Sequence, residues 1–323
     1  MGNYDLKMYP PKTFGEKLDY WIGNRPKYYR VSETGRMHGY NSSEVDLVWF
    51  EKFIQHYVHG GDEKVYHMMG VFGSKMFCKR HRFPHTIFFS GETVHTGKLL
   101  LEYDYYCLDR VDLSMTFDRV EAPNYLRFPQ WIMWLFEPVL DKNYISNRVK
   151  EINEAKSTGK EEVIIICNHD GHKTRAPICD SLSDILSITY GGRWRNTTRD
   201  LWDKYNDDKI RYLHEFKFNI CPENRNVKDY VTEKVFESFA GGTIPIYYGS
   251  NNEPEPGIVN PDAVLFWDLE HPENNEQVKS RIKELNESET SRQAFLSQVK
   301  LLPHTVDYVY DTLCELKKRL EEI

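Results

Sequence analysis

The chain has 323 residues and a formal net charge of −7, from 42 Lys and Arg against 49 Asp and Glu. Proteins that bind the phosphates of DNA or RNA usually carry a basic excess, so this charge disfavours a role on duplex nucleic acid. Charged residues make up 28% of the chain, and no stretch approaches the ~18 consecutive apolar residues of a transmembrane helix.

The N-terminus and the cysteines indicate the compartment. Residues 1–6 contain no basic stretch followed by an apolar run, unlike a secretory signal peptide. The six cysteines are scattered without a CxxC pair, which is typical of reduced core thiols. We therefore expect a cytoplasmic protein, with peripheral attachment to the inner membrane as the alternative.

Beyond the first fifty or so residues, short apolar runs alternate with longer helical patterns. Four runs predict strands, at 86–89, 162–167, 243–248 and 263–267. The run that includes Val163 and Ile166 is apolar without alternation, as in a parallel strand covered on both faces. Helices are predicted at 233–240, 275–301 and 304–323. Strands that alternate with helices indicate an α/β protein with mainly parallel sheets.

Two features predict where elements and domains end. Gly241 and Gly242 should terminate the helix at 233–240, because glycine accepts the left-handed conformation that follows a helix. The polar segment 141–160 precedes the strong strand at 162 and is the best domain boundary. It divides the chain into domains 1–145 and 146–323. Ligands of such sheets bind beyond the carboxyl ends of the strands.

The segment 218–234 predicts an anion site of that kind. It consists of a strand, a polar loop and a helix that starts near Thr232, which could cap the helix. A helix N-terminus with Lys234 in its first turn suits a diphosphate. Asn224, Tyr230 and Glu233 could meet a base and a ribose by hydrogen bonds and stacking. The alternative is an ordinary capped helix with a solvated Glu-Lys pair.

The sequence resembles a known family at this segment. Residues 229–237, running into 242–250, are similar to the signature of the α1,3/4-fucosyltransferases, glycosyltransferase family 10, and match bacterial members best. The strand 218–224 resembles that family's strand ending in Glu-Asn. Residues 191–197, Gly-Gly-Arg-Trp-Arg-Asn-Thr, resemble a further bacterial block.

The resemblance also implies roles for single residues. Arg175 stands where the family places an arginine on the donor phosphates, and Asn168 stands where it has an asparagine of the donor site. The residues around Asn168 depart from the family pattern, and a surface position is the alternative for Arg175. Residues 82–93 resemble the family's strand followed by Gly-Glu-Asn, with Thr93 in place of Asn. This implies that Glu92 is the general base, the alternative being a solvated turn carboxylate. Residues 1–60 match nothing in the family.

The chemistry of the implied reaction agrees with these residues. A nucleoside diphosphate departs without being protonated, so one carboxylate that deprotonates the acceptor hydroxyl suffices for displacement with inversion. The departing charge needs cations or a metal ion. No Asp-x-Asp motif follows a strand, so Arg175, Lys234 and the helix N-terminus are the candidates. We expect no required cofactor, with weak stimulation by Mn²⁺ or Mg²⁺ left open.

A metal site is a rival for one segment, because several potential ligands lie within thirteen residues: Cys167, His169, Asp170, His172 and Cys179. Their spacing fits no zinc pattern.

The resemblance implies the GT-B fold, in which two Rossmann-like domains face each other across a cleft. Domain 1–145 would bind the acceptor and domain 146–323 would bind GDP-fucose, with the terminal helix packing back on the first domain. The implied acceptor is GlcNAc or Glc of a Galβ-GlcNAc or lactose-type glycan, fucosylated at the 3- or 4-hydroxyl. The product would be a Lewis-type antigen on a bacterial surface polysaccharide or lipopolysaccharide. The alternatives are a transferase for another GDP-sugar, such as GDP-mannose, and a non-catalytic nucleotide-sugar or glycan-binding protein.

Overall fold

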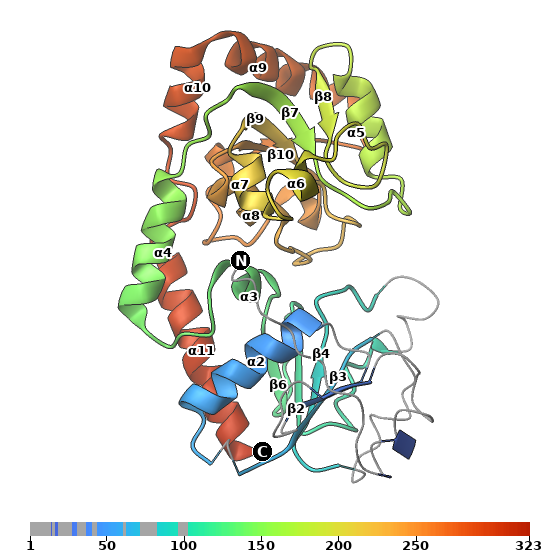
Figure 1. Cartoon of the computed structure of the whole chain (residues 1–323), viewed down its shortest axis with the longest axis vertical. Helices are drawn as coiled ribbons and strands as arrows, with labels where there is room; N and C mark the ends of the chain where they lie inside the picture. Colours follow the sequence, from blue (N-terminus) through green and yellow to red (C-terminus); the bar gives the residue numbers. More distant parts are fainter. Residues whose placement is uncertain are drawn as a thin grey trace. The chain divides into compact units, whose positions relative to one another are not determined.

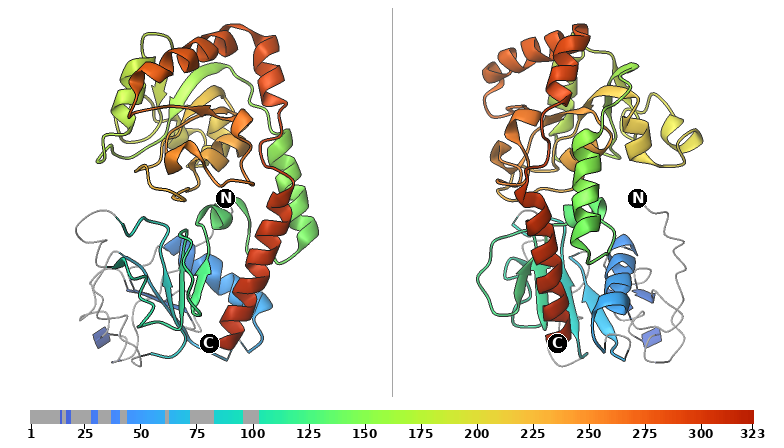
Figure 2. Two further views of the ribbon diagram at one scale, coloured as in Figure 1. Left: turned by 180° about the vertical axis from the view of Figure 1, so that it is seen from behind. Right: turned by 90° about the vertical axis from the view of Figure 1, so that its left-hand side faces the viewer.

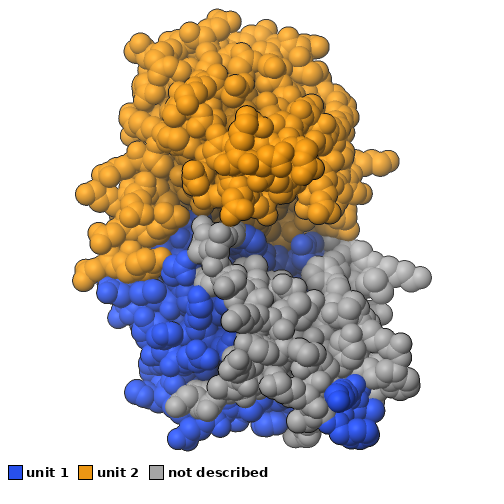
Figure 3. Space-filling view, viewed as in Figure 1, with its two compact units in different colours: residues 1–142, 308–323 blue, residues 143–307 orange. Residues whose placement is uncertain are grey.

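The computed structural model describes residues 14, 17–18, 28–30, 37–40, 44–60, 63–71, 83–95 and 103–323. The chain divides into two compact units (Figure 3). Unit 1 comprises Met1–Lys142 and Tyr308–Ile323, and unit 2 comprises Asn143–Asp307. The polypeptide therefore passes from one unit to the other twice. No helix in the described ranges is long and apolar enough to cross a bilayer.

Unit 1 is built on a six-stranded sheet whose strands follow one another in chain order (Figure 1). The strands are β1 (Tyr28–Arg30), β2 (Met37–Tyr40), β3 (Tyr66–Met69), β4 (Thr86–Phe89), β5 (Leu113–Thr116) and β6 (Tyr125–Arg127). β1 pairs antiparallel with β2, and every later pair is parallel. All residues of β3, β4 and β5 are buried, as expected for parallel strands covered on both faces.

Helices cover the sheet of unit 1. These are α2 (Glu44–Tyr57), the short α3 (Trp131–Leu135) and α11 (His304–Glu322). α2 buries Trp49, Phe50 and Phe53 completely, and the Phe50 ring meets Phe89 of β4 edge-on at 5.4 Å between centroids. The last turns of α11 lie along the sheet (Figure 2), where Tyr66 of β3 donates a hydrogen bond to the carbonyl of Leu320 at 3.2 Å.

Unit 2 contains a fully parallel five-stranded sheet of order β11-β10-β9-β7-β8. Its strands are β7 (Glu161–Ile165), β8 (Ile188–Tyr190), β9 (Phe216–Ile220), β10 (Ile244–Tyr247) and β11 (Leu265–Phe266). The chain runs from β7 to β8 on one side and then returns to place β9 on the other side of β7. β7 and β9 therefore flank a topological switch point, where sheets of this kind bind ligands beyond the strand ends.

The helices of unit 2 lie on both faces of this sheet. Its α-helices are α4 (Lys142–Glu154), which begins at the last residue of unit 1, α5 (Arg175–Leu182), α6 (Asp200–Asp203), α7 (Lys209–Leu213), α8 (Lys234–Ala240), α9 (Asn275–Glu287) and α10 (Glu289–Leu296). Three short 3-10 helices are η3 (Ser250–Asn252), η4 (Pro261–Ala263) and η5 (Pro272–Asn274). Side chains of α5, α9 and α10 pack with one face of the strands, including Ile178, Ile282 and Phe295. Leu213 of α7 packs with Ile164 on the other face.

The structure confirms the strand predicted at 86–89 and the helix predicted at 304–323, apart from the last residue. It also confirms the glycine stop after α8, because Gly242 has a φ of +74°. A Cβ atom at Gly242 would lie 2.5 Å from the backbone of Lys156 and Ser157, so the position also requires glycine for close packing.

Three predicted elements are corrected. The polar boundary 141–160 is mostly the helix α4, because Ile145, Val149 and Ile152 form a buried stripe at helical spacing. The helix predicted at 275–301 is two helices that meet at Ser288, whose backbone is extended and whose side chain caps α10 by accepting from the Ser291 amide. The strand predicted at 263–267 shrinks to β11, because η4 occupies its start.

Candidate functional site

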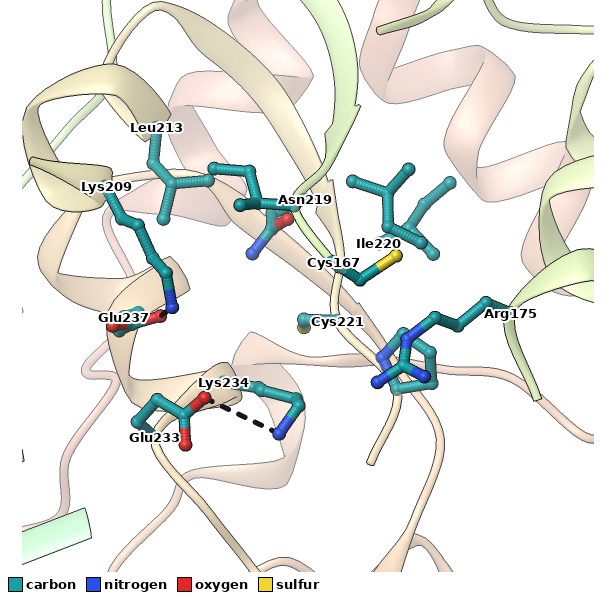
Figure 4. A pocket seen from close by; sticks show the side chains of 13 residues that line it. Cys167, Arg175, Lys209, Leu213, Asn219, Ile220, Cys221, Glu233, Lys234 and Glu237 are labelled. Atoms are coloured by element: carbon teal, nitrogen blue, oxygen red, sulfur yellow. Dashed lines mark hydrogen bonds and ion pairs between the residues drawn. The ribbon is translucent and has the colours of Figure 1, made fainter. Parts of the chain in front are cut away.

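A small polar pocket lies at the carboxyl ends of β7 and β9, at the switch point of unit 2 (Figure 4). Residues that follow these strands line it, together with side chains of α5, α7 and α8. Its volume is about 40 Å³, far below the roughly 300–1,000 Å³ of pockets that hold cofactors. It can therefore be only the inner end of a site for anything larger than water.

Arg175 forms one wall of the pocket from the first turn of α5. Asp170 fixes this turn, because its carboxylate accepts hydrogen bonds from the amides of Arg175 and Ala176 at 3.0 and 2.9 Å. The Arg175 guanidinium donates to the carbonyl of His169 at 2.9 Å and to the side chain of Asn224 at 2.6 Å. Its side chain is only 5% exposed. The arginine is thus held in one orientation and is not a surface residue.

Glu223 organises the opposite wall. Its completely buried carboxylate accepts hydrogen bonds from the Thr232 amide at 2.8 Å, the Thr232 hydroxyl at 2.7 Å, the Lys234 ammonium at 3.3 Å and the Tyr247 hydroxyl at 3.4 Å. We call these four residues the Glu223 cluster. A Cβ atom at Gly249 would lie 2.6 Å from the Glu223 side chain, so glycine leaves the room that this carboxylate occupies. Burial raises the pKa of Glu223, while the nearby Lys234 and the hydrogen bonds from Thr232 act to lower it.

Lys234 links the Glu223 cluster to the rest of the pocket. Its ammonium lies 3.3 Å from Glu223 and 3.5 Å from Glu233. Burial disfavours the charged form of Lys234, but attraction to these two carboxylates outweighs burial and raises its pKa. Burial likewise disfavours ionised Glu233, and attraction to Lys234 and Lys209 outweighs it and lowers the Glu233 pKa. Both side chains are therefore charged at neutral pH.

A second lysine lies at the other side of the pocket (Figure 4). Lys209, the first residue of α7, places its ammonium 3.5 Å from the Glu237 carboxylate. Attraction to Glu237 raises the Lys209 pKa. The pocket thus brings together three cations from three helices: Arg175, Lys209 and Lys234. Arg175 lies close enough to Lys234 that its charge acts to lower the Lys234 pKa. Arg175 and Lys234 repel each other at the ends of parallel strands, and such a pair suits an anion such as a diphosphate.

The loop after β8 supports the pocket from outside. A Cβ atom at Gly192 would lie 2.1 Å from the carbonyl oxygen of Cys167, so the two backbones are in direct contact. The amide of Trp194 donates to the same carbonyl at 3.1 Å. This explains why residue 192 is glycine: a larger side chain would displace the residues that follow β7.

The predicted donor residues fall into two groups. Arg175, Asn224, Glu233 and Lys234 come together at the pocket and its rim. Asn168 lies exposed in the loop after β7, at the same edge of the sheet.

The structure also places the two remaining donor residues, and it corrects one predicted role. Tyr230 is completely buried, and its contact with the donor stays a prediction. Thr232 does not cap the helix, because α8 begins at Lys234 after Glu233, and no side chain caps it. The Thr232 hydroxyl instead donates to Glu223 and accepts from Lys234 at 2.7 Å.

Sequence reasoning missed Glu223 and Lys209 as parts of the site. Glu223 carried a signal, since it is an acidic residue directly after the apolar run of β9. Lys209 carried none, because it stands in a polar stretch that nothing distinguishes from a solvated surface.

The rival metal site at residues 167–179 is not assembled: within the described part of the chain, no group of three His, Cys, Asp or Glu side chains could hold an ion. Asp170, one of the potential ligands of that rival site, accepts hydrogen bonds from the first amides of α5.

Glu92 lies in unit 1, in the turn that follows β4. Its amide donates to the Ser90 hydroxyl at 3.1 Å, and that hydroxyl donates to the Glu92 carbonyl at 2.8 Å. The Glu92 side chain is half-buried. A Cβ atom at Gly91 would lie 2.2 Å from the Gln130 side chain, so glycine lets the turn pass close to that residue. The carboxylate is therefore carried on a turn fixed at the carboxyl end of a buried strand.

Comparison with known families decides where this chain belongs. Residues 155–322, more than half of the chain, match the family described as Glycosyltransferase family 10 (fucosyltransferase) C-term. The chain belongs to glycosyltransferase family 10. The matched region of this family 10 chain contains the pocket and the whole Glu223 cluster.

Individual relatives match over different lengths. Alpha-(1,3)-fucosyltransferase FucT of Helicobacter pylori is 43% identical over 72 residues, which are 22% of this chain and 14% of that relative. Alpha-(1,3)-fucosyltransferase B of Drosophila melanogaster is 25% identical over 262 residues, which are 72% of this chain and 57% of that relative. This family 10 chain therefore spans less than two thirds of the length of either relative.

A solved structure confirms the fold class. The crystal structure of an alpha1,3-fucosyltransferase with GDP-fucose aligns with a TM-score of 0.51 at 20% identity, covering 84% of each chain. At this identity the likeness concerns the fold: a GT-B type protein with two α/β units and mainly parallel sheets.

Proposed function

We propose that this family 10 protein is an inverting fucosyltransferase that moves fucose from GDP-fucose to a sugar hydroxyl. The observation that carries the proposal is the pocket at the switch point of unit 2, which brings three cations together within the region that matches the family. In this pocket Arg175 lies near Lys234, which belongs to the Glu223 cluster. The relatives named alpha-(1,3)-fucosyltransferases support fucose as the transferred sugar.

In this proposal the pocket stabilises the departing GDP. Arg175 offers a guanidinium held by His169 and Asn224, so little ordering is needed when the phosphate binds. Lys234 adds a point charge, and Asn224, Glu233 and Asn168 lie where they could orient the nucleotide and the sugar. Preorganised cations supply the electrostatic stabilisation that a metal ion supplies in other transferases. We therefore propose that no metal is required, with weak stimulation by Mn²⁺ or Mg²⁺ left to experiment.

Glu92 is the proposed general base. A single displacement needs one carboxylate that takes the proton of the attacking hydroxyl, while the diphosphate leaves unprotonated. The position of Glu92 at the carboxyl end of β4 supports this role, since functional residues of α/β sheets gather at that edge.

The acceptor and the linkage follow from the family. We propose transfer to the 3-hydroxyl, with the 4-hydroxyl as the alternative, of GlcNAc or Glc in Galβ-GlcNAc or lactose-type glycans. The product would be a Lewis-type glycan made by a bacterial-type enzyme. A cytoplasmic location stays a prediction.

The test is acceptor-dependent release of GDP from GDP-fucose with N-acetyllactosamine, measured with and without EDTA. We expect release that survives EDTA. Release that EDTA abolishes would contradict the metal-free mechanism. Release from GDP-mannose in place of GDP-fucose would reassign the donor. If the protein binds GDP-fucose but releases no GDP with any Galβ-GlcNAc or lactose acceptor, a non-catalytic binding protein would be favoured.

A further inference from the structure

A second polar cluster lies in unit 1, outside the pocket of unit 2. It joins the turn after β4 to the turn after β5, two adjacent parallel strands whose carboxyl ends meet at one edge of the sheet. Its members are His95, Tyr106 and Asp118. His95 follows the proposed base Glu92 by three residues in the same turn, so the cluster belongs to the segment that the proposed reaction uses.

The pairing of His95 with Asp118 fixes the imidazole. His95 Nε2 lies 2.9 Å from Asp118 Oδ1. Because a carboxylate oxygen only accepts, Nε2 must carry the proton, which leaves Nδ1 of the neutral ring as an acceptor. No residue of the described part of the chain bonds to Nδ1, and the His95 side chain is 38% exposed. The pair thus presents a hydrogen-bond acceptor of fixed orientation.

Asp118 is itself held in place. Its amide donates to the Thr116 hydroxyl at 3.2 Å, and its carbonyl accepts from the Tyr125 hydroxyl at 2.8 Å. Its side chain is only 13% exposed. Asp118 therefore holds the imidazole in one orientation, as carboxylates do for histidines that act on a ligand.

Tyr106 completes the cluster at a cost in backbone energy. Its ring meets the His95 ring edge-on at 6.1 Å between centroids, and its hydroxyl lies 3.3 Å from His95 Nε2. Tyr106 and Cys107 both have left-handed backbones, with φ of 56° and 55°. Such a conformation costs roughly 1–3 kcal/mol for a residue other than glycine, and it persists where the surrounding structure requires it. Here the Ser114 hydroxyl secures it by donating to the Tyr106 carbonyl at 2.6 Å.

We propose that His95, Asp118 and Tyr106 form a subsite for the acceptor saccharide, in which a sugar hydroxyl donates a hydrogen bond to His95 Nδ1 and the Tyr106 ring packs against the sugar. Sugar hydroxyls both donate and accept, so they match a fixed acceptor beside an aromatic ring. This inference rests on the proposed function for the identity of the ligand. It adds a binding role for His95 that is independent of the proton transfer assigned to Glu92.

The experiment measures the binding of N-acetyllactosamine to the full chain in the absence of donor. Isothermal titration calorimetry or saturation-transfer NMR detects the binding. His95→Phe keeps an aromatic ring beside Tyr106 but removes the acceptor nitrogen. We expect it to weaken disaccharide binding roughly 3- to 10-fold, as expected for one lost hydrogen bond, while GDP binding stays unchanged. Asp118→Asn, which can turn an amide N–H toward Nε2 and move the ring proton to Nδ1, should also weaken binding. The matched control is His271→Phe, since His271 pairs with Glu273 at 3.6 Å on the exposed surface of unit 2.

The outcomes separate the subsite from a structural tether and from the proposed function. Unchanged disaccharide binding in His95→Phe, or no disaccharide binding by the unmodified chain, would overturn the subsite. A variant that loses GDP binding and thermal stability in parallel would identify a structural tether, which also overturns it. His95-dependent disaccharide binding without any turnover of GDP-fucose would support the subsite and refute the proposed function.

Discussion

The pocket of unit 2 and the turn after β4 in unit 1 hold their polar side chains in different ways. In unit 2 the charges hold one another: Lys234 contacts two carboxylates, and Glu223 accepts four hydrogen bonds while completely buried. In unit 1 the backbone of the Glu92 turn is fixed through Ser90, while the Glu92 side chain is half-buried.

This difference separates binding from chemistry in mutational experiments. A charge removed from the pocket leaves a buried partner without compensation, so folding and donor binding should fail together. The Glu92 side chain is half-buried, and Gln keeps its shape, so Glu92→Gln should impair the reaction far more than the fold. The predictions below test this separation, from the largest expected effect to the smallest.

Glu92→Gln should lower kcat by roughly 10²–10⁴-fold, the contribution typical of a general base. The melting temperature and the affinity for GDP should stay as they are, because Gln has the same shape. The measurement is acceptor-dependent GDP release beside a thermal melt. Glu121→Gln, an exposed carboxylate of the same unit, is the control. A Glu92→Gln protein that retains full activity would remove Glu92 from the mechanism.

Lys234→Met should lower the free energy of unfolding by about 3 kcal/mol, because it strands two carboxylates, one of them completely buried. GDP binding should fall with it, and chemical denaturation with calorimetry measures both. Lys204→Met is the matched control: it breaks an exposed pair with Asp200, and water screens such a pair, so the free energy of unfolding should stay nearly unchanged. If both changes lowered the free energy of unfolding equally, the buried ion pairs of Lys234 would stabilise the fold no more than an exposed pair does.

Lys300 offers a contrast within unit 2, since it is a buried lysine that pairs with no carboxylate of the residues the structure describes. Its ammonium donates to the carbonyls of Ile152, Asn153 and Ala155 at the end of α4. Burial, assisted by Lys156, lowers the pKa of Lys300 from 10.5 to about 8. Burial thus lowers the pKa of Lys300, whereas the neighbouring carboxylates outweigh burial and raise the pKa of Lys234.

The sign of the pH effect follows from this shift. Between pH 8 and pH 10.5 the unfolded chain binds more protons than the folded one, so the free energy of unfolding rises with pH. Relative to Lys300→Met, the unmodified protein should gain about 2 kcal/mol between pH 7 and pH 10. Denaturation at several pH values measures this difference. Lys160→Met, which removes an exposed lysine, should show no such gain, and an equal gain there would contradict the assignment.

Thr232→Val should have the smallest effect. It removes a hydroxyl that bridges Glu223 and Lys234 but keeps the shape of the side chain. The expected loss is about 1 kcal/mol of unfolding free energy, with a raised KM for GDP-fucose. Thr232→Ser keeps the hydroxyl and should restore the donor KM. A Ser variant as impaired as the Val variant would show that the methyl group, and not the hydrogen bonds, matters at this position.

Much of the fold could be predicted because its signals are local. The run of β4 was apolar from Ile87 to Phe89, and Gly242 stands where only glycine accepts both the backbone and the close packing. The break at Ser288 was missed because the amphipathic pattern continues across it, whereas the cap on the Ser291 amide becomes visible only in the folded chain. The stripe of α4 was overlooked because three apolar residues lie among many charged ones.

The sequence by itself determined the α/β class, the family and the group of residues around 224–234 that carries the candidate donor site. Only the tertiary structure decided what these residues do. In the folded chain Thr232, predicted to cap a helix, donates a hydrogen bond to Glu223. Tyr230 is buried, and Lys209 reaches the pocket from α7. The physical reason is that a buried carboxylate must satisfy its oxygens with whatever donors the packed chain supplies. Those of Glu223 come from residues 9, 11 and 24 positions away, a distance that no local pattern records.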